Sequence, residues 1–418
     1  MRASGDGATA QGGLKRRSLA MGGAALAGSL LVGRRARAAA PIRIGAINPY
    51  TGAMALYGTE VTRGYELAID HANAAGGVLG RTVELVRGDA ATPQQGISAV
   101  AQLAGKVDLF TGTYLSAVSN AASDAALRYN RIYWDTNALA QNLTDRDLPN
   151  FVRSGPDAAA FAKGSAETVT GLIAPALKKD PKSLTVWIEH EDSIYGTSIA
   201  QTQRTLLQAA GVKVAGMGAH SAASIDLTDS VLRAKRANPD VWIDTGYVPD
   251  GNLLLRTARD QGFAPPAMLW VGTGDTPETL KALGAKYLEG LLVISYPRPD
   301  VAESYGPGAR DYLAAYKAKF KQDPIAPQGM TAYVGMQMLL QAVAAGGGTD
   351  MAKVHAAAAA MDRPLHSYAT GFGFKLDKNF QNIRAAPTTI QWQSGRPVTV
   401  FPKDAGQPGT TLRNRPKT

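Results

Sequence analysis

The chain has 418 residues, of which 45% are hydrophobic and 19% are charged, so it can bury a large core, and we expect two domains. It contains no cysteine, which excludes disulfide bonds, zinc–thiolate sites, a thiol nucleophile and a lipid-modified cysteine anchor. The formal net charge is +10. Whether this charge indicates an acidic partner such as nucleic acid depends on where the basic residues lie in the sequence.

Much of this positive charge lies in the first 38 residues, which have the layout of an export signal. Arg16 and Arg17 precede an apolar stretch at 20–33, and small residues at 36 and 38 form a cleavage site. The apolar stretch is too short to remain as a membrane span. The paired arginines favour the twin-arginine export route, and a general-route signal is the alternative.

Removal of residues 1–38 leaves 37 basic and 33 acidic residues, a net charge of +4. These charges are interspersed, without a basic stripe that alternates with aromatic residues, so nucleic-acid binding is not predicted. No later segment is apolar over the length of a membrane span. We therefore expect a monomer that is free in the periplasm and not inserted in a membrane.

Strands and helices alternate along the mature chain, which predicts an α/β fold. The first expected strands lie at 42–49, 82–90, 107–113 and 131–138, with helices at 60–77, 93–106 and from 118. The pattern restarts after 156, with strands at 184–190, 212–220, 241–247, 267–273 and 291–297 and helices at 196–211, 227–239 and 251–262. Two amphipathic stretches at 305–320 and 331–345, a hairpin at 390–402 and a polar tail follow. Two doubly wound parallel-sheet lobes in tandem are the simplest architecture.

Ligands of open α/β sheets bind beyond the carboxyl ends of the strands, where helix N-termini point. The loops at these ends are 49–58, 112–118, 135–140, 190–196, 246–250 and 272–276. In the second of them, Ser116 offers a hydroxyl where a strand turns into a helix, and the following amides are free to bind an anion. We predict that a carboxylate binds there; the alternative is that Ser116 caps its own helix.

The other loops supply tyrosines and short polar side chains. Tyr57 suits a pocket wall, and Tyr195 and Tyr247 stand at helix starts where they can close over a ligand. Thr273 and Asp275 belong to the last loop, where capping of the next helix is the alternative role for Asp275. His190 is expected to be a rim residue because no nucleophile accompanies it in the sequence.

No enzyme motif is present in the sequence. There is no HExxH, no GxSxG and no Walker A motif, and the stretch GTGDT lacks the third glycine of a dinucleotide fingerprint. No cluster for a metal, haem or iron–sulfur centre is apparent. We expect a binding protein without catalytic residues, metal or cofactor.

The opening segment from IRIGAINPYTG through NAAGGVLGR and VELVRGDA to AQLAGK, and later EHEDSIYG and GYVPDGNLLLRTARDQGF, resemble the branched-chain amino acid-binding family. These are type I periplasmic binding proteins of ABC transporters. The resemblance covers about 41–400 and rests on the ordered set of motifs.

The resemblance implies two lobes that are joined by three crossovers and close on the ligand by a hinge motion. The crossovers are expected near 153–157, 295–299 and 370–376. Lobe 1 would comprise 39–156 and 298–372, lobe 2 would comprise 157–297 and 373–405, and 406–418 would be a loose tail.

The resemblance also implies roles for individual residues. Ser116 and the amides near Ala138 and Leu139 would hold the ligand carboxylate. The side-chain pocket would be lined by Tyr57, Tyr114 and Leu115, and Tyr195 and Tyr247 would close from the opposite lobe.

One departure from the family bears on the ligand. Amino acid binders of the family place a glutamate after the strand AMLWV, where this chain has Thr273. A buried ammonium without a carboxylate is costly, so either Asp275 replaces the glutamate or the ligand has no ammonium. Trp134 and Trp270, at strand ends, favour a flat ligand unless they pack in the core.

These observations predict a periplasmic receptor that binds a small carboxylate-bearing ligand, a branched-chain or other amino acid, and delivers it to an inner-membrane ABC permease. The alternatives are a binder of an aromatic acid, a keto acid or an amide, and a sensor that signals to a membrane partner.

Overall fold

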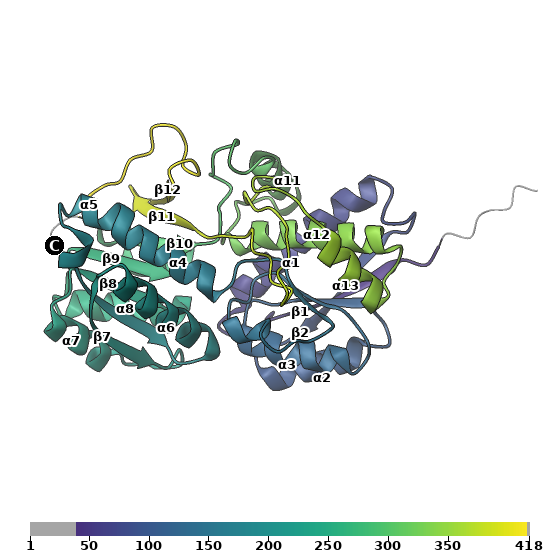
Figure 1. Cartoon of the computed structure of the whole chain (residues 1–418), viewed down its shortest axis with the longest axis horizontal. Coiled ribbons are helices and arrows are strands. Elements are labelled where there is room, and N and C mark those ends of the chain that lie inside the picture. The colour runs from purple at the N-terminus through teal and green to yellow at the C-terminus, as the bar shows by residue number, and fades with distance from the viewer. Residues whose placement is uncertain (1–38, 416–418) are drawn as a thin grey trace, which may run out of the picture. The chain divides into compact units, whose positions relative to one another are not determined.

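The computed structural model describes residues 39–415 (Figure 1). The expected export signal at 1–38 and the last three residues lie outside this range. Two β-sheets organise the chain, one with five strands and one with seven. We call the half built on the five-stranded sheet lobe 1 and the half built on the seven-stranded sheet lobe 2. The α/β fold with two doubly wound lobes is confirmed.

Lobe 1 has an entirely parallel sheet in the order β2-β1-β3-β4-β5. Its strands are β1 (Ile42–Asn48), β2 (Val83–Asp89), β3 (Leu109–Gly112), β4 (Tyr133–Asp135) and β5 (Phe151–Arg153). Its helices are α1 (Ala55–Ala74), α2 (Pro93–Leu103), α3 (Ser116–Leu127), α11 (Ala309–Phe320), α12 (Gln328–Gly346) and α13 (Met351–Ala360), with a 3₁₀ turn η1 (Gln141–Leu143). The carboxyl ends of β1, β3 and β4 therefore share one edge.

Segments that are distant in sequence build this lobe, because α12 packs along α1 (Figure 1). The two helices approach so closely that a Cβ atom on Gly64 would lie 2.0 Å from the carbonyl oxygen of Gly329. Glycine at this position permits the contact, which closes lobe 1 around its core.

Lobe 2 has the sheet order β12-β11-β10-β9-β8-β6-β7, in which β10, β11 and β12 pair antiparallel and the other neighbours pair parallel. Its strands are β6 (Thr185–Glu191), β7 (Lys213–His220), β8 (Val241–Thr245), β9 (Ala267–Val271), β10 (Leu292–Ser295), β11 (Thr388–Gln393) and β12 (Arg396–Phe401). Its helical segments are α4 (Ala158–Thr168), η2 (Val169–Ile173), α5 (Ala174–Ala176), η3 (Pro181–Ser183), α6 (Ile194–Ala209), α7 (Thr228–Ala237), α8 (Val248–Asp260), α9 (Pro277–Leu283) and α10 (Ala285–Leu288). The expected terminal hairpin is β11–β12.

The chain passes between the two sheets after β5, after β10 and before β11. The third passage comes later than the expected 370–376. Phe374 still stacks on Trp134 of lobe 1, with ring centroids 5.9 Å apart, and Gln381 still pairs with Arg153 at the end of β5. These contacts hold the chain on lobe 1 until after Asn382, whose amide nitrogen donates to the carbonyl of Arg153.

The expected loose tail packs against lobe 2 as far as it is described. Between 406 and 415 the tail forms no helix or strand, but the Arg413 amide donates to Gln391 at 2.8 Å, and the side chain of Arg413 pairs with Glu289 at 3.3 Å. Leu412 packs against the lobe 2 core. Within residues 39–415, no helix combines the length and hydrophobicity of a membrane span.

Candidate functional site

A small cavity lies between the lobes, at the carboxyl ends of strands from both sheets. It is lined by Tyr114, Asn137, Leu139, Tyr195, Tyr247, Gly272 and Tyr296. Its volume is about 10 Å³, which is room for about one water molecule. The halves also touch directly, since the Tyr296 hydroxyl of lobe 2 donates to the carbonyl of Asn137 in lobe 1. A ligand larger than water therefore requires the two walls to separate.

Four tyrosines form a continuous aromatic contact across the cavity. Tyr57 stacks on Tyr114 with ring centroids 4.1 Å apart and an interplanar angle of 16°. Tyr114 meets Tyr247 of lobe 2 edge-on at 5.8 Å, and Tyr247 contacts Tyr195 at 5.1 Å. Such rings offer apolar faces with polar edges, which suits a small ligand that has both an apolar part and a polar head.

The lobe 2 wall is held by backbone contacts of these tyrosines. The hydroxyl of Tyr195 lies 3.1 Å from the Val271 carbonyl and 3.3 Å from the Gly246 carbonyl. A Cβ atom on Gly272, whose φ is +73°, would stand 2.1 Å from that hydroxyl, so glycine is required there. Tyr247 precedes α8, and its amide donates to the Asp250 carboxylate at 3.1 Å.

Ser116 is the first residue of α3 and is buried at the lobe 1 wall. Its Oγ accepts hydrogen bonds from the amides of Leu139 and Ala140, at 3.2 and 3.1 Å. The alternative that Ser116 caps its own helix is wrong, because Leu115 stands at the cap position without a side-chain hydrogen bond to the helix. A hydroxyl that accepts two amides directs its own O–H toward another acceptor, so the group can donate to an anion.

The loop that supplies these amides is anchored by Asp135 at the end of β4. Its carboxylate accepts from the amides of Asn137 and Ala138, at 3.1 and 2.9 Å, and from the hydroxyl of Ser119. Burial raises the pKa of Asp135 to about 7, against the opposing effect of these hydrogen bonds. The loop therefore has a fixed conformation in which its last two amides point to Ser116.

Three buried oxygens near the aromatic contact have no hydrogen-bond partner among the described residues. They are the hydroxyl of Tyr57, Oγ1 of Thr273 and Oδ1 of Asp275. Burial first, and then the charge of Asp275, raises the pKa of Tyr57. A buried oxygen without a partner is costly, and a ligand with N–H or O–H groups would satisfy these atoms.

The other oxygen of Asp275 is occupied. It accepts from the Ser295 hydroxyl at 2.7 Å and lies 3.8 Å from the guanidinium of Arg298. Asp275 does not cap α9, because Thr276 holds that position and accepts from the amide of Thr279. Ser295 and Arg298 thus hold one oxygen of the carboxylate, and the other oxygen has no partner among the described residues.

The structure brings most of the predicted residues together. Of these residues, Tyr114, Leu139, Tyr195 and Tyr247 line the cavity, whereas Ser116, Tyr57, Leu115, Ala138, Thr273 and Asp275 do not line it. Among the latter, Ser116 contacts the Leu139 amide and Tyr57 stacks on Tyr114. Leu115 packs between the core clusters beside α3, and Ala138 is fully buried.

The two tryptophans do not face the cleft. Trp134 belongs to the lobe 1 core, and Trp270 packs edge-on against Trp242 at 5.0 Å in lobe 2. They give no support to a flat ligand. His190 is buried, and its Nδ1 lies 2.7 Å from the carbonyl of Glu191.

Three residues that line the cavity, Asn137, Gly272 and Tyr296, were not predicted from the sequence. Asn137 and Gly272 lie in the predicted cleft loops 135–140 and 272–276, but asparagine and glycine are common loop residues and do not by themselves indicate a ligand contact. Tyr296 directly follows β10 and was within the expected second crossover. The same rule about strand ends, applied to β10, would have found it.

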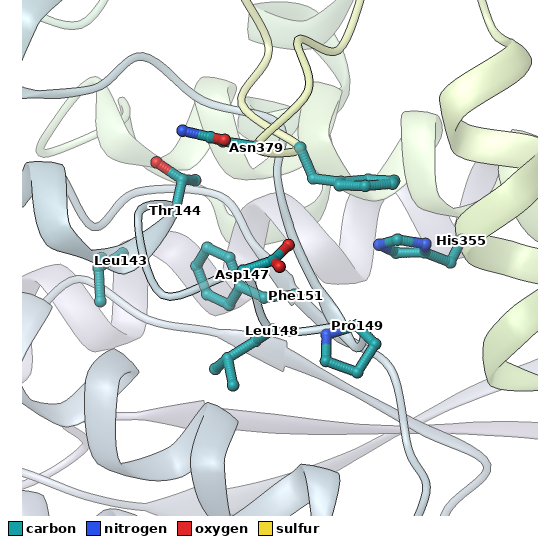
Figure 2. A pocket seen from close by; sticks show the side chains of 9 residues that line it. Leu143, Thr144, Asp147, Leu148, Pro149, Phe151, His355 and Asn379 are labelled. Atoms are coloured by element: carbon teal, nitrogen blue, oxygen red, sulfur yellow. The ribbon is translucent and has the colours of Figure 1, made fainter.

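A second pocket lies wholly in lobe 1 and has a larger volume, about 290 Å³ (Figure 2). Its labelled side chains come from the segment 143–151, from α13 and from the loop before β11. His355 stacks on Phe380 with ring centroids 3.4 Å apart, and burial lowers the pKa of this histidine. All of its lining residues belong to lobe 1.

A model of the periplasmic binding protein family matches residues 41–396. Leu/Ile/Val-binding protein homolog 7 of Brucella suis is 36% identical over 384 residues, which is 91% of this chain and 96% of that protein.

Two solved structures have the same fold. The branched-chain amino acid transporter substrate-binding protein LivJ of Streptococcus pneumoniae, in complex with isoleucine, superposes with a TM-score of 0.73 at 20% identity, covering 86% of this chain and 99% of LivJ. A solute-binding protein of R. palustris in complex with 4-hydroxybenzoate superposes with a TM-score of 0.74 at 19% identity, covering 90% and 98%.

The matches to the family model and to the Brucella relative each span nearly the whole of the described chain. The family consists of periplasmic binding proteins, and the relative carries the name of a Leu/Ile/Val-binding protein homolog. The chain belongs to the branched-chain amino acid-binding family of type I periplasmic binding proteins, a family of substrate-binding proteins and not of enzymes.

Proposed function

We propose that this protein binds a small amino acid in the cleft between its lobes and delivers it, in the periplasm, to an inner-membrane ABC permease. The ligand carboxylate binds the Ser116 hydroxyl, which the loop at 137–140 positions through the amides of Leu139 and Ala140. The observation that carries this proposal is that the Ser116 hydroxyl accepts hydrogen bonds from the amides of Leu139, which lines the cavity, and Ala140. Its own O–H is therefore left to donate to the ligand.

The ligand ammonium binds the free oxygen of Asp275, which takes the place of the glutamate of related amino acid binders. This oxygen is buried and has no partner among residues 39–415. Tyr57 and Thr273 offer two further oxygens to the same head group. The tyrosine rings of both lobes enclose an apolar side chain, in agreement with the Leu/Ile/Val-binding name of the Brucella relative.

An aromatic acid without an ammonium is the second candidate. The ring contacts of Tyr57, Tyr114, Tyr247 and Tyr195 favour it, and so does the 4-hydroxybenzoate complex of the R. palustris neighbour. It brings no ammonium to neutralise the Asp275 carboxylate, which is the reason we place it second.

A thermal-shift panel tests both candidates, because a ligand that binds only the folded state raises the melting temperature. The panel contains L-leucine, L-isoleucine, L-phenylalanine, benzoate and 4-hydroxybenzoate, with L-leucinol as the control that lacks a carboxylate. We expect stabilisation by an amino acid and none by leucinol. Stabilisation by benzoate alone would select the second candidate, and equal stabilisation by leucine and leucinol would contradict the carboxylate site.

A further inference from the structure

Arg153 is a fully buried arginine at the end of β5. Its described hydrogen-bond acceptors are all neutral. One terminal nitrogen donates to the carbonyls of Ala138 and Ala140, at 3.2 and 2.7 Å, the other to the hydroxyl of Thr144 at 3.3 Å, and Nε donates to the Gln381 side chain. Burial lowers the pKa of Arg153, and the charges of Asp157 and Asp135 oppose this effect.

The carbonyl of Ala138 and the amide of Leu139 belong to one peptide group. Arg153 binds the oxygen end of that group, and the hydrogen end donates to Ser116 Oγ. The order of contacts is therefore guanidinium, peptide, hydroxyl, and then the cleft. Hydrogen bonds in such a chain polarise one another in a low-dielectric interior.

The Arg153 cation at one end of this series of hydrogen bonds makes the Leu139 amide a stronger donor to Ser116. The Ser116 hydroxyl in turn becomes a stronger donor to whatever it meets in the cleft. An ionised carboxylate gains more from this polarisation than a neutral amide does, because charge-assisted hydrogen bonds are about twice as strong as neutral ones.

A buried arginine is costly unless it is compensated, and an anion in the cleft adds a compensating charge. The same guanidinium also binds the side chain of Gln381, which lies on lobe 1 just before the third passage of the chain between the lobes. Arg153 therefore contacts both the loop at 137–140 and the segment that precedes the third passage between the lobes.

We propose that Arg153 is a positioning residue that makes the cleft selective for an ionised carboxylate over a neutral isostere, without touching the ligand. This inference rests on the proposed carboxylate site. It deepens that proposal by assigning the selectivity to a charge located behind the binding loop.

Calorimetry on the full mature chain tests it with two matched pairs of probes, L-leucine with L-leucinamide and benzoate with benzamide. The measured quantity is the affinity ratio of acid to amide, for the pair whose acid binds the wild type. Arg153→Met should lower this ratio about tenfold, which is about 1.4 kcal/mol, and Arg153→Lys should restore most of it.

A second variant keeps the arginine in place. Gln381→Glu sets an isosteric carboxylate against Nε and should lower the ratio about fivefold, so the test survives if Arg153→Met does not fold. Arg146→Gln is the matched control. It also removes an arginine of lobe 1, but one that binds Asp124 and the Asn120 carbonyl, and the ratio should stay unchanged.

A purely structural role for Arg153 would weaken acid and amide equally, and an unchanged ratio in both Arg153→Met and Gln381→Glu would overturn the inference. Failure of the wild type to bind either acid would instead contradict the proposed function, and the inference with it.

Discussion

The two walls of the cleft present their polar groups in different ways. On lobe 1 the groups belong to the main chain and are already paired, since the amides of Leu139 and Ala140 bind Ser116, which holds one donor for the ligand. On lobe 2 they are side-chain oxygens, and those of Thr273 and Asp275 have no partner among the described residues. The carboxylate-binding groups of lobe 1 are thus paired before the ligand binds, although the Tyr57 hydroxyl is not, whereas the oxygens of lobe 2 are left for the ligand to pair.

This difference suggests a division of labour. A paired, rigid wall recognises the carboxylate that many ligands of the family share. The lobe 2 wall, whose side-chain oxygens lack partners, distinguishes ligands by their N–H and O–H donors. A ligand without such donors leaves these buried oxygens without hydrogen bonds, which costs free energy.

The largest effect should come from the lobe 2 carboxylate. Asp275→Asn keeps the shape of the side chain but removes its charge. We expect the affinity for L-leucine to fall by about 3 kcal/mol, because a buried ammonium then lacks its counter-charge. Calorimetry checks this, with benzoate as a control ligand whose affinity should not fall. An unchanged affinity for leucine would remove Asp275 from the site.

His220 should stabilise lobe 2 in a pH-dependent way. Its Nε2 lies 3.1 Å from Asp250 of α8, its Nδ1 lies 3.4 Å from Glu189 of β6, and Asp244 of β8 adds its charge. Burial alone lowers the pKa of His220, but these acids raise it to about 10. A raised histidine pKa stabilises the fold fully below the unfolded value of about 6.5, and this stability is lost as pH rises toward 10.

His220→Gln should therefore lower the free energy of unfolding by about 2 kcal/mol at pH 6, and the deficit should shrink as the pH approaches 10. Urea denaturation of both proteins across this range gives the measurement. A deficit that is the same at every pH would show that His220 stabilises the lobe by packing and not by charge.

Ser116→Ala tests the lobe 1 wall. The variant removes the donor to the ligand and leaves two buried amides without an acceptor, so we expect a loss of about 1.5 kcal/mol in affinity for any carboxylate ligand. Titration with L-leucine and benzoate should show the loss in whichever acid binds. Asn120→Ala, on the same helix, serves as the control. Equal affinities of wild type and Ser116→Ala would exclude Ser116 from the site.

The smallest effect concerns Tyr57, whose buried hydroxyl lies where the walls meet and has no described partner. Tyr57→Phe should raise the free energy of unfolding of the ligand-free protein by about 1 kcal/mol and weaken the ligand slightly. Tyr133→Phe is a matched control, because its hydroxyl is also buried without a described partner but lies in the lobe 1 core. It should share the stability gain and leave the affinity unchanged; the comparison fails if both variants lose affinity alike.

The sequence by itself determined the α/β class, the two lobes and the loops that form the cleft. Hydrophobic periodicity reports which faces are buried, and strand order places loop ends on one edge. Ser116, Tyr195 and Tyr247 could be selected for this reason, because each follows a strand in a loop that the rule identifies.

Only the tertiary structure decided how these groups act. It showed that Ser116 accepts hydrogen bonds from amides 23 and 24 residues away and does not cap α3, which was the alternative role. It also placed Trp134 and Trp270 in the cores and added Tyr296 to the cavity lining. It placed Arg153 against the carbonyls of the loop at 137–140, whose amides bind Ser116. Such contacts join residues far apart in the chain, and a local pattern carries no information about which distant atoms a hydrogen bond will meet.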